Sequence, residues 1–280
     1  MKTVLITGCS SGIGLYCAKA LQADGFYVIA TVRKEKDREK LTALGINTEQ
    51  LDLNSSQSIE AFCKKINQYY PTLDLLINNA SFAQAGAIED LSREAMKAQF
   101  ETNFFGVMEL TNRVIKKMRV QNHGQIIFIG SLLGYVTMPF RGAYCASKYA
   151  LEAMSDALRQ ELHKTPITIS LIEPGPIYSQ FRENVKAPFQ EHIDRNNSPH
   201  QATYKAMEKA FFQTEDKTPF YLAPDAVYQK IKRAINAKNP KARYYVGFPA
   251  YLFRLLKKVL PAKCMDKFML YITKNERKMD

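Results

Sequence analysis

The sequence contains no apolar run long enough to cross a bilayer, no CxxC motif and no cluster of histidines. A membrane-spanning helix needs about 18 consecutive apolar residues, so we expect none in this chain. Five scattered cysteines, an odd number, predict no metal site and are typical of a reducing compartment. The apolar run after Met1 is too short for a signal peptide, so we expect a cytoplasmic protein.

Positive charge is in excess, but it is concentrated near the C-terminus. The formal net charge is +12, from 39 Lys and Arg against 27 Asp and Glu. Residues 230–280 hold 14 of these basic residues and three acidic ones, which leaves +11. The other 229 residues hold 25 basic and 24 acidic residues and are nearly neutral. Because nucleic acid is bound through basic surface, we expect the main body to bind no nucleic acid.

Apolar segments alternate with amphipathic ones through the first two thirds of the chain. The apolar segments are nearly continuous runs of Val, Ile and Leu, as expected for strands covered on both faces. This alternation predicts an α/β fold, a doubly wound parallel sheet (Rossmann fold) in one domain with right-handed crossovers. We expect strands at 3–7, 27–32, 48–52, 73–77, 125–129, 168–172 and 242–246, and helices at 13–24, 36–44, 55–69, 93–119, 143–163 and 223–237.

Two segments interrupt this alternation. Residues 176–223 are polar with scattered prolines, which predicts a lid inserted into a catalytic domain of residues 1–247. Residues 248–280 form a basic amphipathic extension, in which 249–273 would either contact a membrane interface peripherally or pack on the body. We expect Leu252, Leu255, Leu256, Val259 and Leu260 to form one apolar stripe, with Arg254, Lys257 and Lys258 mainly off it.

A glycine-rich segment joins the first strand to the first helix. Its pattern is Gly-x-x-x-Gly-x-Gly, and the residues expected to bind a cofactor there are Gly8, Ser10, Ser11, Gly12, Ile13 and Gly14. Glycines permit a tight turn and let the backbone approach a pyrophosphate, which also meets the positive end of the helix. A glycine-rich turn without a ligand has the same composition, but its place at the first strand–helix junction favours dinucleotide binding.

The end of the second strand carries cations where an NAD-binding site would carry a carboxylate. Apolar Val32 is followed by Arg33 and a lysine. Because a guanidinium can bind a 2′-phosphate, we expect NADP(H) rather than NAD(H), with Ser11 as a second contact; the alternative is a solvated basic turn. After the third strand, Asp52 and Leu53 are expected at the adenine, although Asp52 could instead cap the next helix.

Polar residues follow the next two strands, where the carboxyl edge of an open sheet forms the ligand crevice. Asn79 and Ala80 follow the fourth strand, and Ser131 follows the fifth. Tyr144 and Lys148 come next, at an i, i+4 spacing that puts both on one helical face. A nearby ammonium and a positively charged nicotinamide ring would lower the pKa of the tyrosine. Tyr144 could then exchange a proton with a carbonyl or alcohol oxygen while the nicotinamide exchanges hydride.

Tyr-x-x-x-Lys alone is common on helix surfaces, but here it accompanies the glycine pattern, Asn-Asn-Ala and a serine after a strand. In this order and at these intervals, residues 1–180 resemble the short-chain dehydrogenase/reductase family, and most of all its hydroxysteroid and retinol dehydrogenase branch. The resemblance implies a catalytic tetrad of Asn103, Ser131, Tyr144 and Lys148. Asn103 would hold a water that links Lys148 to solvent, and Ser131 would polarise the substrate oxygen. Tyr144 would be the acid/base, and Lys148 would lower its pKa and hold the nicotinamide ribose.

The resemblance also implies a contact with the nicotinamide after the sixth strand, through Pro174, Gly175, Ile177 and Ser179. Ser179 stands where the family usually has threonine, and it keeps the hydroxyl group. Ser81 stands where glycine usually follows Asn-Asn-Ala, so its side chain would crowd or hydrogen-bond near the cofactor.

The predicted lid is rich in large apolar side chains, which suit a bulky hydrophobic carbonyl or alcohol substrate such as a lipid, steroid or retinoid. These residues could equally be core or subunit contacts, and relatives in the family are commonly homo-oligomers. They are Phe181, Val185, Phe189, Ile193, Phe211, Phe212, Phe220 and Tyr221.

The sequence therefore favours an NADP(H)-dependent carbonyl reductase or alcohol dehydrogenase. One alternative, a nucleotide-sugar epimerase, shares Tyr-x-x-x-Lys but usually has a different glycine pattern and a longer C-terminal substrate domain. The other is a non-catalytic NADP(H)-binding sensor or membrane-associated protein, for which the intact tetrad would have no use.

Overall fold

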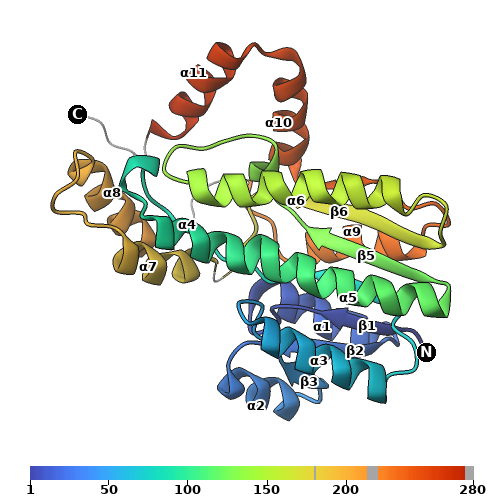
Figure 1. The fold of residues 1–280 in the computed structure, drawn as a ribbon. Coiled ribbons are helices and arrows are strands. Elements are labelled where there is room, and N and C mark those ends of the chain that lie inside the picture. The colour runs from blue at the N-terminus through green and yellow to red at the C-terminus, as the bar shows by residue number, and fades with distance from the viewer. Residues whose placement is uncertain (180, 213–219, 275–280) are drawn as a thin grey trace.

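A parallel sheet forms the centre of the molecule (Figure 1). The computed structural model describes residues 1–179, 181–212 and 220–274, with the side chains of all of these except 181–183 and 210–212. Within them, seven strands form one sheet in the order β3-β2-β1-β4-β5-β6-β7, and every neighbouring pair is parallel. The strands are β1 (Thr3–Ile6), β2 (Tyr27–Val32), β3 (Thr48–Gln50), β4 (Leu75–Asn78), β5 (Gly124–Ile129), β6 (Ile167–Pro174) and β7 (Arg243–Val246).

Helices cover both faces of this sheet, which is why the central strands β1, β4 and β5 are mostly apolar and buried. Val4 and Ile6 of β1 pack in one apolar cluster with α1 (Gly12–Ala23), α2 (Glu35–Ala43) and α9 (Asp225–Asn236). Leu5, on the opposite face, packs in another with α3 (Ser56–Tyr69), α5 (Gly106–Gln121) and α6 (Gly142–Glu161). The predicted doubly wound α/β fold is confirmed, and all seven expected strands are present within a few residues of their expected bounds.

The helix expected over residues 93–119 is not a single regular helix. It consists of α4 (Arg93–Phe100), a π-helical segment at Glu101–Phe105 and then α5. The π turn contains Asn103, whose side chain is buried. Short π segments occur often at functional sites, because the extra residue redirects the side chains of one turn.

Residues after β6 contain two helices that the sequence analysis did not assign, α7 (Phe181–His192) and α8 (Gln201–Phe212). They lie at one end of the molecule in Figure 1. The side chains of Phe181, Phe211 and Phe212, which were expected to contact substrate, lie outside the described residues.

The C-terminal extension forms two helices, α10 (Phe248–Val259) and α11 (Ala262–Ile272). Leu252, Leu256 and Leu260 pack toward the body, with Phe253 and Met265, against residues 132–136. The body covers only part of the expected apolar stripe, because Leu255 and Val259 remain exposed. None of the described helices is long and apolar enough to pass through a bilayer.

Candidate functional site: the carboxyl edge of the sheet

The glycine loop after β1 lies where the strand order changes direction, between β1 and β4, which is the ligand crevice of doubly wound sheets. Gly8 has φ +70°, and a Cβ there would lie 2.7 Å from the Cα of Ala80. A Cβ on Gly14 would lie 2.3 Å from the carbonyl oxygen of Gly8 and 2.5 Å from Nδ2 of Asn79. A side chain at either position would therefore displace the loop, which explains why both are glycine.

Asn79 holds this loop in place. Its Nδ2 donates hydrogen bonds to the carbonyl oxygens of Thr7 (2.9 Å) and Gly8 (3.0 Å). The backbone N–H groups of Asn79 and Ala80 both donate to Oγ1 of Thr7, at 3.0 Å. The amide of Asn79, expected at the cofactor, thus bonds the protein backbone and joins the end of β4 to the loop after β1.

The N-terminus of α1 opens toward the loop. Its N-cap is Ser11, which within the described residues makes no side-chain hydrogen bond to the first turn, and that turn holds no acidic residue. The first N–H groups of a helix have no partner within it, so they can bind an anion. Gly12, at φ +56°, lies so close to Ser179 that a Cβ on it would be 3.1 Å from the Cβ of that serine. The predicted phosphate loop and the predicted nicotinamide turn are therefore adjacent, and this glycine cradle fits a dinucleotide.

The ends of β2 and β3 carry the residues expected at the adenosine end. Arg33 is exposed, and its carbonyl oxygen accepts a hydrogen bond from Gln50 at 3.0 Å. Oδ1 of Asp52 accepts from the backbone N–H of Asn54 at 3.0 Å. Asp52 does not cap the next helix, because the N-cap of α3 is Ser55, whose hydroxyl accepts from a first-turn N–H.

Leu53 lies against the helix that follows the π turn. A Cβ on Gly106 would be 1.9 Å from the carbonyl oxygen of Leu53, so the backbone of α5 approaches the loop after β3 as closely as only glycine permits.

Tyr144 and Lys148 lie together on α6, next to the carboxyl end of β5. Both side chains are buried, and Nζ of Lys148 is 5.8 Å from the centre of the Tyr144 ring. The ammonium donates a hydrogen bond to the carbonyl oxygen of Ile129 at 2.8 Å, two residues before Ser131. Oγ of Ser131 accepts from the backbone N–H of Leu133 at 3.1 Å, which fixes its position at the turn.

Burial controls the acidity of both groups. It raises the pKa of the Tyr144 hydroxyl above its ordinary value, and a hydrogen bond with Ser131 opposes this shift without cancelling it. It lowers the pKa of Lys148 to about 8. In the protein alone the net shift of the Tyr144 pKa is therefore upward, whereas the lowered pKa predicted from the sequence includes the charge of a bound nicotinamide ring.

Asn103 is oriented by bonds to the backbone and to α6. Its Oδ1 accepts from the N–H of Phe82 at 3.0 Å, and its Nδ2 donates to the carbonyl oxygen of Phe82 at 2.9 Å and to Oγ of Ser147 at 3.1 Å. Ser147 lies between Tyr144 and Lys148 on α6. Asn103 therefore joins the π turn and the loop after β4 to the helix that carries the tyrosine and the lysine.

Residues of the predicted lid pack directly on Tyr144. The tyrosine lies in one apolar cluster with Val185, Phe189, Tyr204 and Met207. The sequence analysis named the first two of these and missed Tyr204 and Met207, although their i, i+3 spacing was a usable sign of a buried helix face.

Hydrogen bonds join α8 to the short 3-10 turn at Ile88–Asp90. The hydroxyl of Tyr204 donates to the carboxylate of Asp90 and accepts from the N–H of Ala87 at 3.0 Å. Ser198 donates to the same carboxylate at 2.7 Å. These bonds, together with the apolar cluster, hold the two added helices over the tyrosine.

A buried charged cluster that was not predicted from the sequence joins α6 to β6 and β7. Glu152 is one turn after Lys148 on α6, and Glu173 is a fully buried residue near the end of β6. Arg243 of β7 reaches Glu152 at 2.9 Å and Glu173 at 3.1 Å, and Arg254 of α10 stacks over the ring of Tyr135 at 5.5 Å. Burial, and then the neighbouring Glu152, raise the pKa of Glu173 to about 9. One proton held between the two carboxyl groups would give a hydrogen bond to Oε1 of Glu152 and Oε2 of Glu173, which have none among the described residues.

We expect Glu173→Gln to remove a pH dependence of stability. Because folding raises the pKa of Glu173 from its ordinary 4.5, its contribution is present below about pH 4.5 and is lost as the pH rises through about 9. A glutamine stays neutral, so the variant should gain stability relative to the wild type across this range, as measured by thermal unfolding at several pH values. Glu161→Gln, an exposed change at the end of the same helix as Glu152, is the control. A stability difference that does not change with pH would contradict a protonated Glu173.

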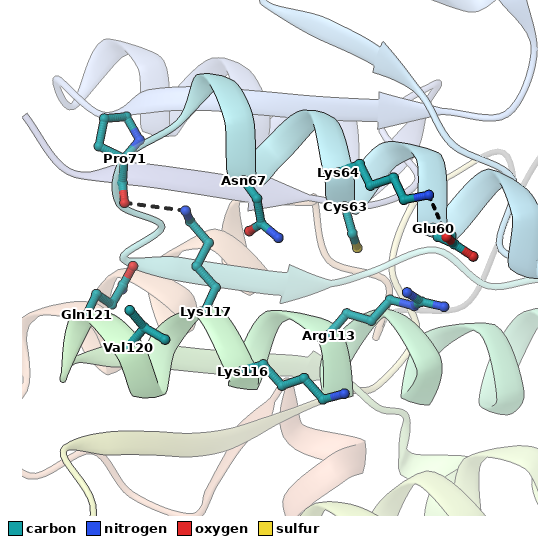
Figure 2. A pocket seen from close by; sticks show the side chains of 10 residues that line it. All are labelled: Glu60, Cys63, Lys64, Asn67, Pro71, Arg113, Lys116, Lys117, Val120 and Gln121. Carbon is teal, nitrogen blue, oxygen red and sulfur yellow. Dashed lines mark hydrogen bonds and ion pairs between the residues drawn. The ribbon is translucent and has the colours of Figure 1, made fainter.

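A separate groove lies away from this edge, between α3 and α5 (Figure 2). It has a volume of about 490 Å³ and is lined mainly by long polar side chains, among them Lys64, Arg113, Lys116 and Lys117. It contains none of the residues expected to bind cofactor or substrate. Among the described residues no group of three or more His, Cys, Asp or Glu side chains could hold a metal ion.

Comparison with known proteins agrees with this geometry. Residues 2–189 match the family model of the short chain dehydrogenases. The chain is 39% identical over 269 residues to the uncharacterized oxidoreductase YbbO of Escherichia coli K12, covering 96% of this chain and 94% of that protein. It is 30% identical over 276 residues to the NADPH-dependent 3-dehydrocapnine reductase of Ornithobacterium rhinotracheale, covering 95% of each. It is 32% identical over 257 residues to human 17-beta-hydroxysteroid dehydrogenase type 1, covering 86% of this chain and 76% of that protein.

Proposed function

This chain belongs to the short-chain dehydrogenase/reductase family, and we propose that within it the chain is an NADP(H)-dependent enzyme that interconverts a carbonyl and an alcohol on a hydrophobic substrate. One observation carries the proposal. The buried hydroxyl of Tyr144 bonds Ser131, and the centre of its ring is 5.8 Å from Nζ of Lys148, at the carboxyl edge of the sheet that also carries the glycine cradle. A protein that only senses NADP(H) would have no use for this proton-transfer group.

The raised pKa of Tyr144 favours carbonyl reduction at neutral pH. A tyrosine that stays protonated can donate its proton to the carbonyl oxygen, while Ser131 polarises the same oxygen. When bound, the nicotinamide supplies or accepts the hydride. In the oxidation direction, the positive charge of the oxidised ring and of Lys148 would favour the deprotonated tyrosine and so oppose the effect of burial.

Lys148 and Asn103 would prepare the tyrosine for this step. The lysine is held by the carbonyl oxygen of Ile129, which leaves further ammonium hydrogens for a ribose hydroxyl. Both amide hydrogens of Asn103 bond Phe82 and Ser147, so its side chain positions α6. A relay water next to Asn103 would therefore be held by an oxygen atom, on the side chain or on the backbone of the π turn.

NADP(H) is proposed over NAD(H) on the chemistry at the end of β2. Apolar Val32 is buried, and Arg33 beside it extends its cation into solvent without a neighbouring carboxylate on that strand end. An exposed guanidinium can close on a 2′-phosphate, whereas a ribose 2′-hydroxyl finds no acidic acceptor here. The relative named as an NADPH-dependent reductase supports the same preference.

A hydrophobic substrate is proposed from the surroundings of the tyrosine. Val185, Phe189 and Met207 pack in the cluster that contains Tyr144, so a substrate that reaches its hydroxyl would contact mainly apolar side chains. The relative named as a hydroxysteroid dehydrogenase supports a substrate of this class.

A turnover screen tests the proposal. The full-length protein is incubated with NADPH or NADH and with aldehydes and ketones of increasing chain length, and cofactor oxidation is followed by absorbance. We expect turnover with NADPH and a rising kcat/KM with apolar size, because each buried methylene adds about 0.8 kcal/mol. Tight NADPH binding without turnover of any carbonyl or alcohol would favour the sensor instead.

A further inference from the structure

The helix α10 is apolar on two sides. Its inner side packs on the body through Ala250, Phe253 and Leu256. On another side, Phe248, Tyr251, Leu255 and Val259 are all exposed, and Leu255 and Val259 are 58% and 63% accessible to solvent. These four follow each other at i, i+3, i+7 and i+11, which aligns them along one face of the helix. We refer to these four residues as the outer strip.

Exposed apolar residues continue at the far end of α11, where Leu270, Tyr271 and Ile272 are exposed. Figure 1 shows that α10 and α11 stand out from the rest of the molecule as a helical hairpin. Exposed apolar side chains gathered on one projecting element usually mark a surface that binds something.

The charge of the hairpin restricts what that partner can be. Residues 248–274 contain six Lys and Arg but only one acidic residue, Asp266. Lys258 immediately precedes Val259 in the helix, and Lys230 of α9 reaches the hydroxyl of Tyr251 at 3.3 Å. A second copy that used the same face would bring like charges together, because a two-fold contact pairs a surface with itself. Nucleic acid would attract the lysines, but its phosphates would offer no apolar contact to the exposed leucine and valine side chains.

We propose that the outer strip and its lysines bind the surface of an anionic lipid bilayer. Aliphatic and aromatic side chains at the outer strip would enter the boundary between headgroups and acyl chains, and the flanking ammonium groups would contact anionic headgroups. The inner side of α10 would keep the hairpin attached to the body. Binding of this kind takes place at the bilayer surface and needs no membrane-spanning helix.

The outer strip leads to the predicted site. Phe248 at its start stacks on Phe220, with ring centres 5.8 Å apart, and Phe220 is also exposed. The adjoining Tyr221 contacts the exposed ring of Tyr178, which lies between Ile177 and Ser179 in the turn expected at the nicotinamide. Binding to a bilayer would thus bring the edge of the proposed catalytic site close to hydrophobic molecules that are dissolved in the bilayer. This last step rests on the proposed function, whereas lipid binding itself does not.

Vesicle flotation tests the proposal. The full chain is mixed with phosphatidylcholine vesicles that either contain or lack phosphatidylglycerol. We expect flotation with the anionic vesicles, weakened by added salt, and a partition coefficient at least about tenfold lower for Leu255→Ser combined with Val259→Ser. The matched control is Leu44→Ser combined with Val120→Ser, which changes the same residue types at sites 57% and 90% exposed elsewhere on the surface. This control should float like the wild type.

Three outcomes would overturn the proposal. The first is that the wild type stays unbound with anionic vesicles, and the second is that the outer-strip variant floats as well as the wild type. The third is that the variant changes the oligomeric state in analytical ultracentrifugation, which would make the strip a subunit interface. Turnover of a water-soluble carbonyl without vesicles is measured in parallel and should be unchanged in the variant. Its absence in the wild type would instead count against the proposed function.

Discussion

Tyr144→Phe is expected to lower kcat by a factor of about 10² to 10⁴, the usual contribution of a positioned acid or base. The affinity for NADPH should stay within about twofold, because the change removes one oxygen and keeps the ring that packs against the predicted lid. Stability should not fall greatly, since the lost hydrogen bond joins Tyr144 to the nearby Ser131 hydroxyl. Steady-state turnover and a fluorescence titration with NADPH measure the two effects separately.

The matched control is Tyr149→Phe, which makes the same chemical change five residues later on the same helix. This tyrosine is half-buried and is not expected at the substrate. Equal activity losses in the two variants would show that the helix tolerates neither change, and would remove the argument for Tyr144 as the acid. An unchanged kcat in Tyr144→Phe would contradict the proposed reaction directly.

Arg33→Ala is expected to weaken NADPH binding by about 10- to 100-fold and to leave NADH binding nearly unchanged. A hydrogen bond to a charged group contributes about 1.5–3 kcal/mol, and only NADPH has the 2′-phosphate that would accept it. Arg33 is exposed, so its loss should leave the thermal stability unaltered within about 0.5 kcal/mol. Dissociation constants for both cofactors at low and moderate salt give the comparison.

Lys36→Ala is the control for Arg33, because it removes an exposed cation from the first turn of α2, close by in sequence. A general electrostatic attraction of the phosphate would be weakened similarly by both changes. A specific contact with the 2′-phosphate would be lost in Arg33→Ala but not in Lys36→Ala. Equal weakening of NADPH and NADH by Arg33→Ala would show that this residue does not distinguish the two cofactors.

Much of the fold could be predicted because its signals are local in sequence. The runs at β1, β4 and β5 are mostly apolar and do not alternate with polar residues, and this predicted a buried parallel sheet without knowledge of the neighbouring strands. The glycines of the first loop and the i, i+4 pair Tyr144 and Lys148 were recognised in the same way. Each of these features depends on a few adjacent residues and on the order of elements.

Other features of the site could not be predicted because the sequence does not show how its segments meet. Asn103 was placed on a regular helix, whereas the chain inserts a π turn there. The amide of Asn79 bonds the backbone of a loop more than 70 residues earlier. Burial of Tyr144 among residues from distant segments raises its pKa in the protein alone.

The sequence by itself determined the α/β alternation, the glycine turn, the spacing of the reacting groups and the concentration of positive charge after residue 230. Only the tertiary structure decided how Glu173 and Arg243 pair, and which side of α10 stays exposed. Helical periodicity brings Leu252, Leu255, Leu256 and Val259 to neighbouring positions, but it does not show which of them another segment covers. Packing of residues 132–136 against α10 makes that choice, and it leaves Leu255 and Val259 exposed to solvent.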